Sequence, residues 1–396
     1  MQNFEFHLPT RIIFGPGSLK KLQKNVKGLG KKAIIVIGQG SVKKHGYLDN
    51  VLSQLKSINV ETIIFEGVES NPKASTIDRG AELAREEKPR FVIGLGGGSV
   101  MDAAKCIAML AVTPGNIWDY AYKGINAEMK KFQNALPLVC IPTVAATSSE
   151  TDRYAVVTNE KTKEKCTVFG DAFFPQLSII DPQLTCSVPQ KTTIDGAIDI
   201  IAHVLEDFLS TNEETILQDR CSLAIVKTVM DYLPRVVDNL RDVEARTQLS
   251  WCSSIALSGF LSGRDGWWPI HSLEHVISGH YDISHGSGLA SLLPAVMRYD
   301  LPEISEKLAM MGEYLFGINL AGMPVKAAAE LSVEKFEEWM RSYNALLPLS
   351  KMCMTKDSLE TMAGDTIRLH GNIRNELPNI RPFSKEDILK LLEEIY

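Results

Sequence analysis

The chain has 396 residues, of which 45% are hydrophobic and 23% are charged, a balance typical of globular proteins rather than of disordered or collagen-like chains. Its 48 acidic residues outnumber its 42 basic residues, giving a net charge of -6 at pH 7, so we expect no nucleic-acid partner. No apolar run approaches the roughly 18 residues that a membrane-spanning helix needs, and residues 1–9 do not resemble a signal peptide. We therefore expect no membrane partner and a cytoplasmic location.

The first predicted element in chain order is a strand at residues 4–8, where hydrophobic and polar residues alternate ahead of a proline. Up to about residue 182, short β-branched runs then alternate with helical stretches. The predicted strands are residues 33–37, 61–65, 91–95, 136–141 and 177–180, and the predicted helices are residues 43–58, 76–87 and 100–112. This alternation predicts an α/β domain over residues 1–182 with a Rossmann-like parallel sheet.

From residue 183 the β-branched runs give way to long segments in which apolar residues recur with the period of a helix. These segments are residues 193–210, 216–233 and 243–262. We therefore expect residues 183–396 to form an all-helical domain. No linker-like composition separates the two domains, which indicates a tight interface of the kind where ligand clefts occur.

Four residues, Gly96 to Ser99, follow the strand at 91–95 and lead directly into a predicted helix. Glycines let the backbone approach a ligand closely, and a helix N-terminus offers free N–H groups and partial positive charge to a pyrophosphate. The alternative is a tight turn without a ligand. Because the spacing matches neither the dinucleotide fingerprint nor the P-loop, the loop indicates a nucleotide without specifying which one.

A second glycine turn, with Gly38, Gly40 and Ser41, follows the first strand of the α/β domain. A carboxylate at such a turn would bind a free ribose 2′-hydroxyl and repel a 2′-phosphate. The turn has none, and Lys43 and Lys44 follow it, so the sequence favours NADP(H) over NAD(H). A plain turn with solvated lysines explains the same residues equally well.

Histidines and a carboxylate recur at helical spacing in the second domain. Asp199 and His203 are four residues apart, as are His271 and His275, and His285 follows ten residues later. A spacing of four puts both side chains on one face of a helix. A single pair of this kind is more often structural, but three imidazoles with one carboxylate suit iron or zinc and leave a coordination position for substrate.

Taken together, these residues resemble the iron-containing (group III) alcohol dehydrogenases, which share their fold with glycerol dehydrogenase and dehydroquinate synthase. Within that family the chain is similar to the butanol dehydrogenase-like and aldehyde reductase branch. The resemblance covers nearly the whole chain. Besides the histidines, it rests on residues 9–10 (PT), 14–15 (FG), 71–72 (NP), 96–105 (GGGSVMDAAK) and 141–150 (IPTVAATSSE).

The resemblance implies a role for each matched position. The metal, Fe(II) or in some members Zn(II), would be held by Asp199, His203, His271 and His285. The nicotinamide cofactor would be bound by Gly38, Gly40, Ser41, Asn71, Gly97, Gly98, Ser99, Asp102, Thr143, Thr147 and Lys165, with Lys165 at a ribose or phosphate oxygen. His275 would stand beside the metal and relay a proton.

Several positions depart from the family pattern. Val144 and Ser148 replace the more usual Thr and Gly, which puts the contacts of that loop in question. Trp267 and Trp268 precede the first histidine of the second pair, where we expect them to line the substrate pocket. Arg153 could clamp an anionic substrate bidentately, although an ion pair between the domains is the simpler interpretation.

The expected reaction is hydride transfer between nicotinamide and a small primary alcohol or aldehyde, with the metal acting as a Lewis acid on the substrate oxygen. Three alternatives remain open. They are a reductase of anionic aldehydes that uses Arg153, a zinc-dependent polyol dehydrogenase similar to glycerol dehydrogenase, and a non-catalytic nucleotide-binding protein. The resemblance and the edge strand at residues 4–8 also predict a homodimer.

Overall fold

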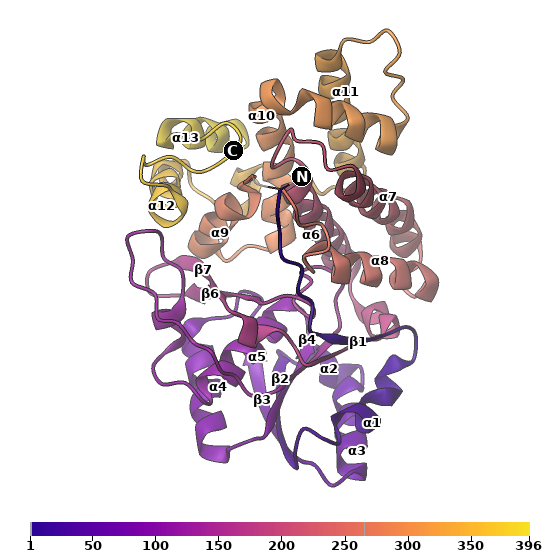
Figure 1. Ribbon diagram of the computed structural model, residues 1–396, viewed down its shortest axis with the longest axis vertical. Coiled ribbons are helices and arrows are strands. Elements are labelled where there is room, and N and C mark those ends of the chain that lie inside the picture. The colour runs from indigo at the N-terminus through magenta and orange to yellow at the C-terminus, as the bar shows by residue number, and fades with distance from the viewer. Residues whose placement is uncertain (1, 265) are drawn as a thin grey trace.

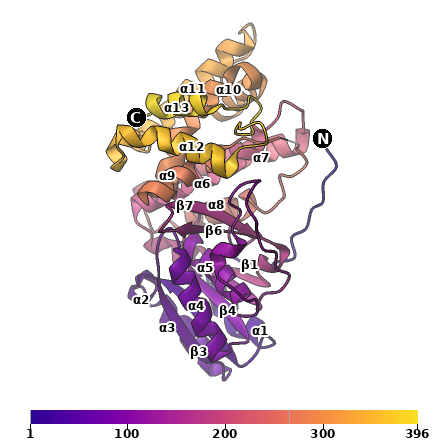
Figure 2. The same cartoon turned by 90° about the vertical axis from the view of Figure 1, so that its left-hand side faces the viewer.

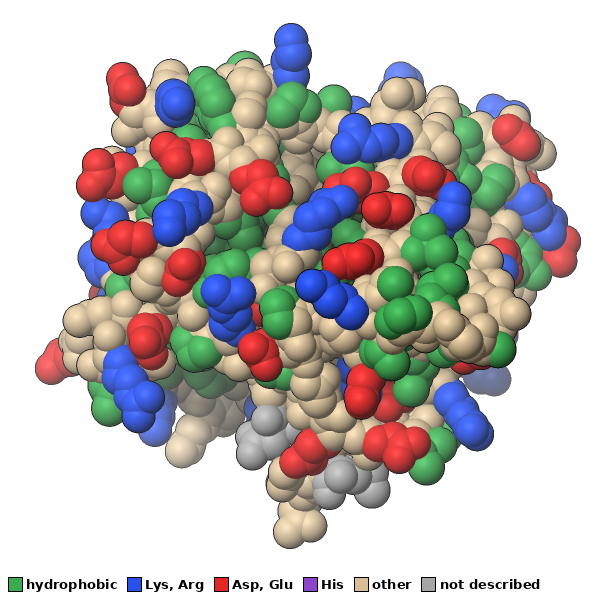
Figure 3. Space-filling view, turned by 90° about the horizontal axis from the view of Figure 1, so that it is seen from above, with side chains coloured by type: hydrophobic (Ala, Val, Ile, Leu, Met, Phe, Trp, Pro, Cys, Tyr) green, Lys and Arg blue, Asp and Glu red, His purple; other side chains and the backbone are tan. Residues whose placement is uncertain are grey.

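A computed structural model describes residues 2–264 and 266–396. A sheet with its covering helices forms one end of the molecule and a group of helices forms the other (Figure 1). Acidic and basic side chains are interspersed over the helical end (Figure 3). Within the two described ranges, no helix is both long enough and apolar enough to cross a membrane.

All strand pairs of the main sheet are parallel, as the sequence predicts. Over the described residues the sheet has six strands, in the order β1 (Arg11–Phe14), β8 (Leu177–Ile180), β5 (Leu138–Pro142), β4 (Phe91–Gly96), β2 (Lys32–Gly38) and β3 (Glu61–Val68). Along β2, Ile34 and Val36 pack into one apolar cluster, and Ile35 and Ile37 into another. Both faces of the sheet are therefore covered, as is usual for parallel sheets.

Helices lie on the two faces of this sheet (Figures 1 and 2). They are α1 (Leu22–Val26), α2 (Ser41–Lys44), α3 (Tyr47–Ser57), α4 (Ala74–Glu87) and α5 (Gly98–Leu110). The helix predicted at residues 43–58 is in fact two, because Gly46 adopts a left-handed φ of 72° between them. The apolar residues of α3 pack on one face and those of α4 and α5 on the other.

The prediction of a strand at residues 4–8 is wrong. Residues 2–10 have no regular secondary structure in the chain described, and the first strand is β1 at Arg11–Phe14, which pairs with β8 at one edge of the sheet. The N-terminal segment instead runs along the helical part, where the backbone N–H of Gln2 donates to the carbonyl of Gly263 at 3.0 Å. Phe4 and Phe6 lie over Gly263 and Gly259, so these aromatic rings use glycine surfaces rather than a strand partner.

A hairpin that the sequence analysis missed stands apart from the main sheet. Strands β6 (Tyr154–Asn159) and β7 (Glu164–Phe169) pair antiparallel. The hairpin packs against α5 on one side and, through β7, against α9 (Ile270–Tyr281) on the other, so it lies between the sheet and the helical part (Figure 2). A Cβ atom at Gly279 of α9 would lie 3.0 Å from the backbone nitrogen of Lys165, and glycine permits this close approach.

After β8 the chain is helical, as predicted. The α-helices are α6 (Gln190–Phe208), α7 (Ile216–Asp238), α8 (Val243–Ala256), α9, α10 (His285–Phe316), α11 (Val325–Ser342), α12 (Leu359–His370) and α13 (Lys385–Glu394). Short 3₁₀ helices along the chain cover Ser18–Lys21, Ile117–Tyr120, Asp171–Phe173, Pro182–Ser187, Leu349–Met352 and Lys356–Ser358. Helix α10 is kinked at Ile304, two residues after Pro302.

The strand order creates a switch point between β2 and β4. From β2 the chain crosses to β3 on one side and then returns to β4 on the other. Ligands of open α/β sheets bind at the carboxyl ends of the strands beside such a point. Here those ends are Gly38 and Gly96, from which the two glycine turns begin.

Candidate active site

The glycine loop lies between β4 and the N-terminus of α5. Gly97 is the N-cap of the helix and Gly98 its first residue. A Cβ atom on Gly98 would lie 3.0 Å from Cβ of Thr147 and closer still to the Thr147 hydroxyl. The structure thus brings two predicted cofactor segments into direct contact, and only glycine fits at their junction. The hydroxyl of Ser99 donates to the carbonyl of Ser70.

The segment 143–151 is fastened to the glycine loop and to α5. The N–H of Thr143 donates to the carbonyl of Gly96 at 2.9 Å. Asp102 accepts from the hydroxyl of Ser149 at 2.6 Å and from the N–H of Val156 at 2.9 Å. Both carboxylate oxygens of Asp102 are therefore engaged by protein donors, which ties this segment and the hairpin to α5.

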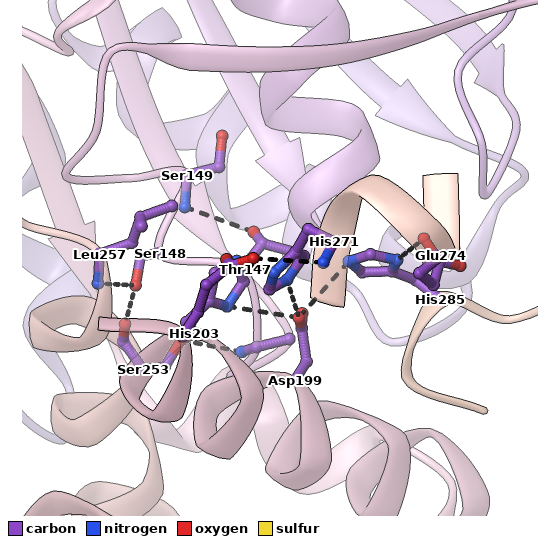
Figure 4. Close-up of polar contacts among 12 residues, drawn as sticks. Thr147, Ser148, Ser149, Asp199, His203, Ser253, Leu257, His271, Glu274 and His285 are labelled. Carbon is purple, nitrogen blue, oxygen red and sulfur yellow. Dashed lines mark hydrogen bonds and ion pairs between the residues drawn. The ribbon is translucent and has the colours of Figure 1, made fainter. Parts of the chain in front are cut away.

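Ser148, which stands where relatives more often have glycine, has a left-handed φ of 57°. Its hydroxyl donates to the carbonyl of Ser253 and accepts from the N–H of Leu257 at 3.1 Å, as Figure 4 shows. These hydrogen bonds to α8 and the residue after it offset the cost of a left-handed serine. The substitution thus leaves the backbone of the loop in a conformation that glycine would favour.

The second glycine turn joins β2 to α2. Gly40 has φ 111° and is the N-cap of α2, and Ser41 is its first residue. Lys43 forms an ion pair with Glu66, near the end of the neighbouring strand β3. The sequence analysis found no carboxylate in the turn itself, but the fold supplies one from β3. This weakens the electrostatic argument for NADP(H).

Asn71 links the nucleotide side of the molecule to the helical part. Its side-chain amide donates to Oδ1 of Asp282 at 2.8 Å and to the carbonyl of Ile283 at 3.2 Å. Lys73 forms an ion pair with Asp282 at 2.9 Å. Asp282 and Ile283 lie in the turn between α9 and α10, so these contacts hold the turn that ends in His285.

The predicted metal ligands converge on one carboxylate oxygen (Figure 4). Oδ1 of Asp199 lies 3.3 Å from Nδ1 of His203, 3.8 Å from Nε2 of His271 and 3.6 Å from Nε2 of His285. Ligand atoms of Asp199, His271 and His285 lie within 4.8 Å of one another. His203 stacks on His271, with ring centroids 4.3 Å apart.

Close helix packing produces this convergence. Asp199 and His203 lie on α6, His271 on α9 and His285 at the start of α10. A Cβ atom on Gly286 would collide with the backbone of Asp195. This glycine therefore lets α10 approach α6, which brings His285 to Asp199.

The donor atoms fit a metal ion. Oδ1 of Asp199, Nδ1 of His203 and Nε2 of His271 are buried without a hydrogen-bond partner. Buried polar atoms are rarely left unsatisfied in proteins, because each costs roughly 1–3 kcal/mol. Oxygen and imidazole donors together suit Fe(II) or Zn(II). The ligand atoms of Asp199, His271 and His285 lie close enough together to share such a cation, whereas His203 falls outside this group.

Two carboxylates that the sequence analysis missed contact the ring nitrogens of His271 and His285 that face away from Asp199. Oε2 of Glu206 lies 2.6 Å from Nδ1 of His271, and Glu274 accepts a hydrogen bond from Nδ1 of His285. Such partners fix the tautomer of metal-binding histidines. A signal for Glu206 was present, because it follows Asp199 by seven residues and therefore lies on the same face of α6.

The charges of this cluster shift several pKa values. Burial would raise the pKa of Asp199, but the three neighbouring histidines outweigh it and lower that pKa. Burial lowers the pKa of His203 to about 4. Burial also opposes protonation of His271, yet Glu206 and Asp199 raise its pKa to about 10. A metal ion that binds His271 must therefore displace a proton.

His275 and Lys165 lie beside the cluster. The ring centroid of His275 is 5.7 Å from that of His285 and 6.5 Å from that of His370. Burial, followed by the charges of Lys165 and His285, lowers the pKa of His275 well below its usual value. The ammonium of Lys165 lies 3.3 Å from Oε2 of Glu274 and 3.4 Å from Nδ1 of His285, so it is close to the metal cluster.

The three predicted substrate residues lie in different surroundings. Trp268 has no exposed surface and donates from its indole N–H to Asp300 at 2.9 Å, so the prediction that it lines the pocket is wrong. Its position just before α9 turns the ring into the helical core. Trp267 is 54% exposed. Arg153 forms a surface ion pair with Asp171 at 2.8 Å, on the sheet side of the molecule rather than between the domains.

Comparison with known proteins identifies the family of the chain. Residues 9–182 match the family described as iron-containing alcohol dehydrogenase, and residues 193–396 match the Fe-containing alcohol dehydrogenase family, C-terminal. The chain is 34% identical over 398 residues to NADH-dependent butanol dehydrogenase A of Clostridium acetobutylicum, and the match covers 100% of both chains. It is 32% identical over 322 residues to the NADPH-dependent aldehyde reductase YqhD of Escherichia coli, with 81% of each covered.

A solved structure shares the whole fold. The crystal structure of NADH-dependent butanol dehydrogenase A from Thermotoga maritima has a TM-score of 0.94 and 33% sequence identity, covering 100% of this chain and 99% of that one. The two family matches together leave only short segments unmatched. The family predicted from the sequence is thus confirmed: the chain belongs to the iron-containing alcohol dehydrogenases.

Proposed function

We propose that this protein is a metal-dependent, NAD(P)-dependent alcohol dehydrogenase or aldehyde reductase that acts on small, uncharged primary alcohols or aldehydes. The observation that carries the proposal is the trio of buried, unsatisfied donor atoms on Asp199, His203 and His271. Membership in a family whose relatives carry the names butanol dehydrogenase and aldehyde reductase supports it.

Asp199, His203, His271 and His285 would hold the metal, with Fe(II) proposed ahead of Zn(II). When bound, the metal supplies Lewis-acid polarisation of the substrate oxygen. The chain itself supplies orientation, because Glu206 and Glu274 fix two of the imidazoles from behind. His275 is buried beside His285 and is proposed to relay a proton as an alcohol is oxidised. Its lowered pKa means that it would pass the proton on rather than hold it.

The cofactor is proposed to lie over the switch point, with its pyrophosphate at Gly97, Gly98 and Ser99. The free N–H groups and partial positive charge at the start of α5 favour an anion there. Thr143 and Thr147, beside this loop, would face the nicotinamide half. Gly38, Gly40 and Ser41 would face the adenosine ribose.

NADPH is proposed over NADH because of Lys43 and Lys44, but the preference should be small. Glu66 neutralises part of this charge through its ion pair with Lys43, and a nearby carboxylate disfavours a 2′-phosphate. The names of relatives include both cofactors.

The test is the initial rate of NADPH and NADH oxidation by protein reconstituted with Fe(II) under anaerobic conditions. The substrates would include butyraldehyde, glycerol in the reverse direction, succinic semialdehyde and sulfoacetaldehyde. Fastest turnover with butyraldehyde supports the proposal. A preference for the acidic aldehydes, or for glycerol with Zn(II), would replace it with one of the alternatives, and cofactor binding without any turnover would favour a non-catalytic protein.

Three further predictions remain for experiment: a domain boundary between residues 182 and 183, a cytoplasmic location and a homodimer. Phe4 and Phe6 are 48% and 51% exposed, and burying such rings against a second copy would stabilise a dimer. Sizing by light scattering at micromolar concentration tests the dimer. A monomer there would rule it out.

A further inference from the structure

Glu274 occupies an enclosed site behind the metal cluster. Its side chain is fully buried, and it has three partners from three elements: Nδ1 of His285 on α10, the ammonium of Lys165 on β7 and the hydroxyl of Ser278 one turn further along α9. Gly288 on α10 leaves the space for it, because a Cβ atom there would lie 2.9 Å from Cγ of Glu274. These polar contacts and the packing against α10 therefore fix the position of the Glu274 carboxylate.

The contact with Glu274 determines which nitrogen of His285 carries a hydrogen. An ionised carboxylate can only accept hydrogen bonds, so Nδ1 of His285 must be the donor. Nε2 then keeps its lone pair. This nitrogen points to Asp199, with 3.6 Å between it and Oδ1, as a metal ligand must.

Lys165 makes this arrangement possible. A carboxylate without access to water is costly unless it is paired, and the Lys165 ammonium, itself only 5% exposed, lies 3.3 Å from Oε2 of Glu274. Of the two nitrogens of His285, the ammonium is near Nδ1, on the side away from Asp199. It therefore compensates Glu274 without occupying the metal position.

The carboxylate behind His271 differs in its surroundings. The side chain of Glu206 is 24% exposed, and the hydrogen bonds that it accepts come from the ring and the backbone N–H of His271. Water can therefore reach the Glu206 carboxylate and replace part of its hydrogen bonding to His271. It cannot reach Glu274 in the same way.

We propose that Glu274, paired with Lys165, acts as a positioning unit that holds His285 in the tautomer and orientation needed for the metal. The inference rests on the proposed function, because it takes His285 as a ligand. Neither residue is a catalytic residue in this proposal. Both act through His285.

The test uses Co(II), whose visible absorption reports the coordination of the bound ion, in the full-length protein. Glu274→Gln keeps the shape of the side chain but removes its charge. It should weaken Co(II) binding by roughly 10- to 100-fold, as is typical for such outer partners, and change the absorption spectrum. The matched control, Glu206→Gln, should weaken binding less.

Lys165→Met is the second variant, and it tests the proposal on its own if Glu274→Gln does not fold. Alone, it should weaken Co(II) binding by roughly tenfold or more, on the same scale of outer-partner effects, and alter the spectrum. Added to Glu274→Gln, it should cause little further loss, because residues that act as a unit are not additive. NAD(P)H affinity, measured by fluorescence, should stay near that of the unmodified protein in Glu274→Gln.

An unchanged Co(II) affinity and spectrum in Glu274→Gln, or in Lys165→Met, would overturn the proposal. So would additive losses in the double variant. A selective loss of NAD(P)H affinity in Lys165→Met would return that residue to the cofactor. Failure of the proposed function looks different, because the unmodified protein would then bind no metal or reduce no aldehyde.

Discussion

The proposed nucleotide site and the proposed metal site, here called the nucleotide side and the metal side, are built from different parts of the chain. The nucleotide side consists mainly of backbone: glycines at the ends of β2 and β4, and the N-terminus of α5. The metal side consists of buried titratable side chains whose charges act on one another. A site built from backbone should lose affinity for its ligand when a substitution adds side-chain atoms. A site built from side chains should lose affinity when a substitution removes ligand atoms or charges.

The strongest test of this contrast removes one charge from the metal side. Asp199→Asn should abolish stable metal binding and turnover, because all three neighbouring histidines meet at this carboxylate, while NAD(P)H affinity should be unchanged. Metal analysis and cofactor fluorescence measure the two effects. The matched control is Asp231→Asn on α7, where an exposed carboxylate forms an ion pair with Lys227. Full metal content in Asp199→Asn would remove Asp199 from the ligand set.

A buried carboxyl group in the helical part should also make the free energy of unfolding depend on pH. Asp300 accepts hydrogen bonds from Trp268 and from Asn379 at 2.7 Å, and burial raises its pKa to about 7. Because this value exceeds the roughly 3.9 of an unfolded aspartate, the stability linked to this proton is present below about pH 4 and is lost as the pH rises to about 7.

Asp300→Asn should therefore remove a slope of up to about 1.4 kcal/mol per pH unit from the free energy of unfolding in that window. Urea denaturation at several pH values, for both proteins, measures it. Parallel curves for the two proteins would show that Asp300 does not titrate there.

On the nucleotide side, the corresponding test adds one carbon. Gly98→Ala would push Cβ into Thr147, and overpacking of this kind costs about 1–3 kcal/mol. NAD(P)H binding should weaken by roughly 5- to 150-fold, with metal content unchanged. Gly364→Ala on α12 is the control, since its Cβ would lie 3.8 Å from Lys385, an ordinary contact. Equal cofactor affinities in all three proteins would contradict a backbone-built site.

The smallest effect is expected at Arg153, which lies outside both sites. Its ion pair with Asp171 is exposed, and such pairs contribute only about 0–1 kcal/mol. Arg153→Ala should leave the ratio of kcat/KM for succinic semialdehyde and butyraldehyde unchanged. A selective loss with the acidic substrate would bring back the anionic-aldehyde alternative.

The sequence predicted most of the fold because β-branched runs and helical periodicity are local signals. It missed the hairpin β6–β7, which belongs to no βαβ unit, and it placed the first strand too early, since the alternation of Phe4 and Phe6 does not require a strand. The wrong prediction that Trp268 lines the substrate pocket has a related cause. Proximity in sequence to His271 does not determine which way a ring turns at the start of a helix.

Spacing along the helices predicted that Asp199 and His203 share one helix face and that His271 and His275 share another. The choice of His285 rather than His275 as a ligand came from the resemblance to the family. The contacts of Glu274 and Lys165 with His285 could not be predicted from the sequence. They depend on how β7 and α10 pack against α9, and no local pattern encodes that packing. Ser148 shows a similar limit, because its partners lie on and just after a helix more than 100 residues away.

The contacts of Asn71 and Lys73 with Asp282 have a consequence for motion. If the halves of the molecule separate to exchange ligands, the hydrogen bond from the Asn71 amide to Asp282 and the ion pair of Lys73 with Asp282 must break together, which releases the turn that leads to His285. Opening would then be a cooperative event rather than gradual fraying. Backbone amides of residues 70–73 and 282–285 should consequently exchange their hydrogens with solvent at a common rate, as a single kinetic unit spanning both halves.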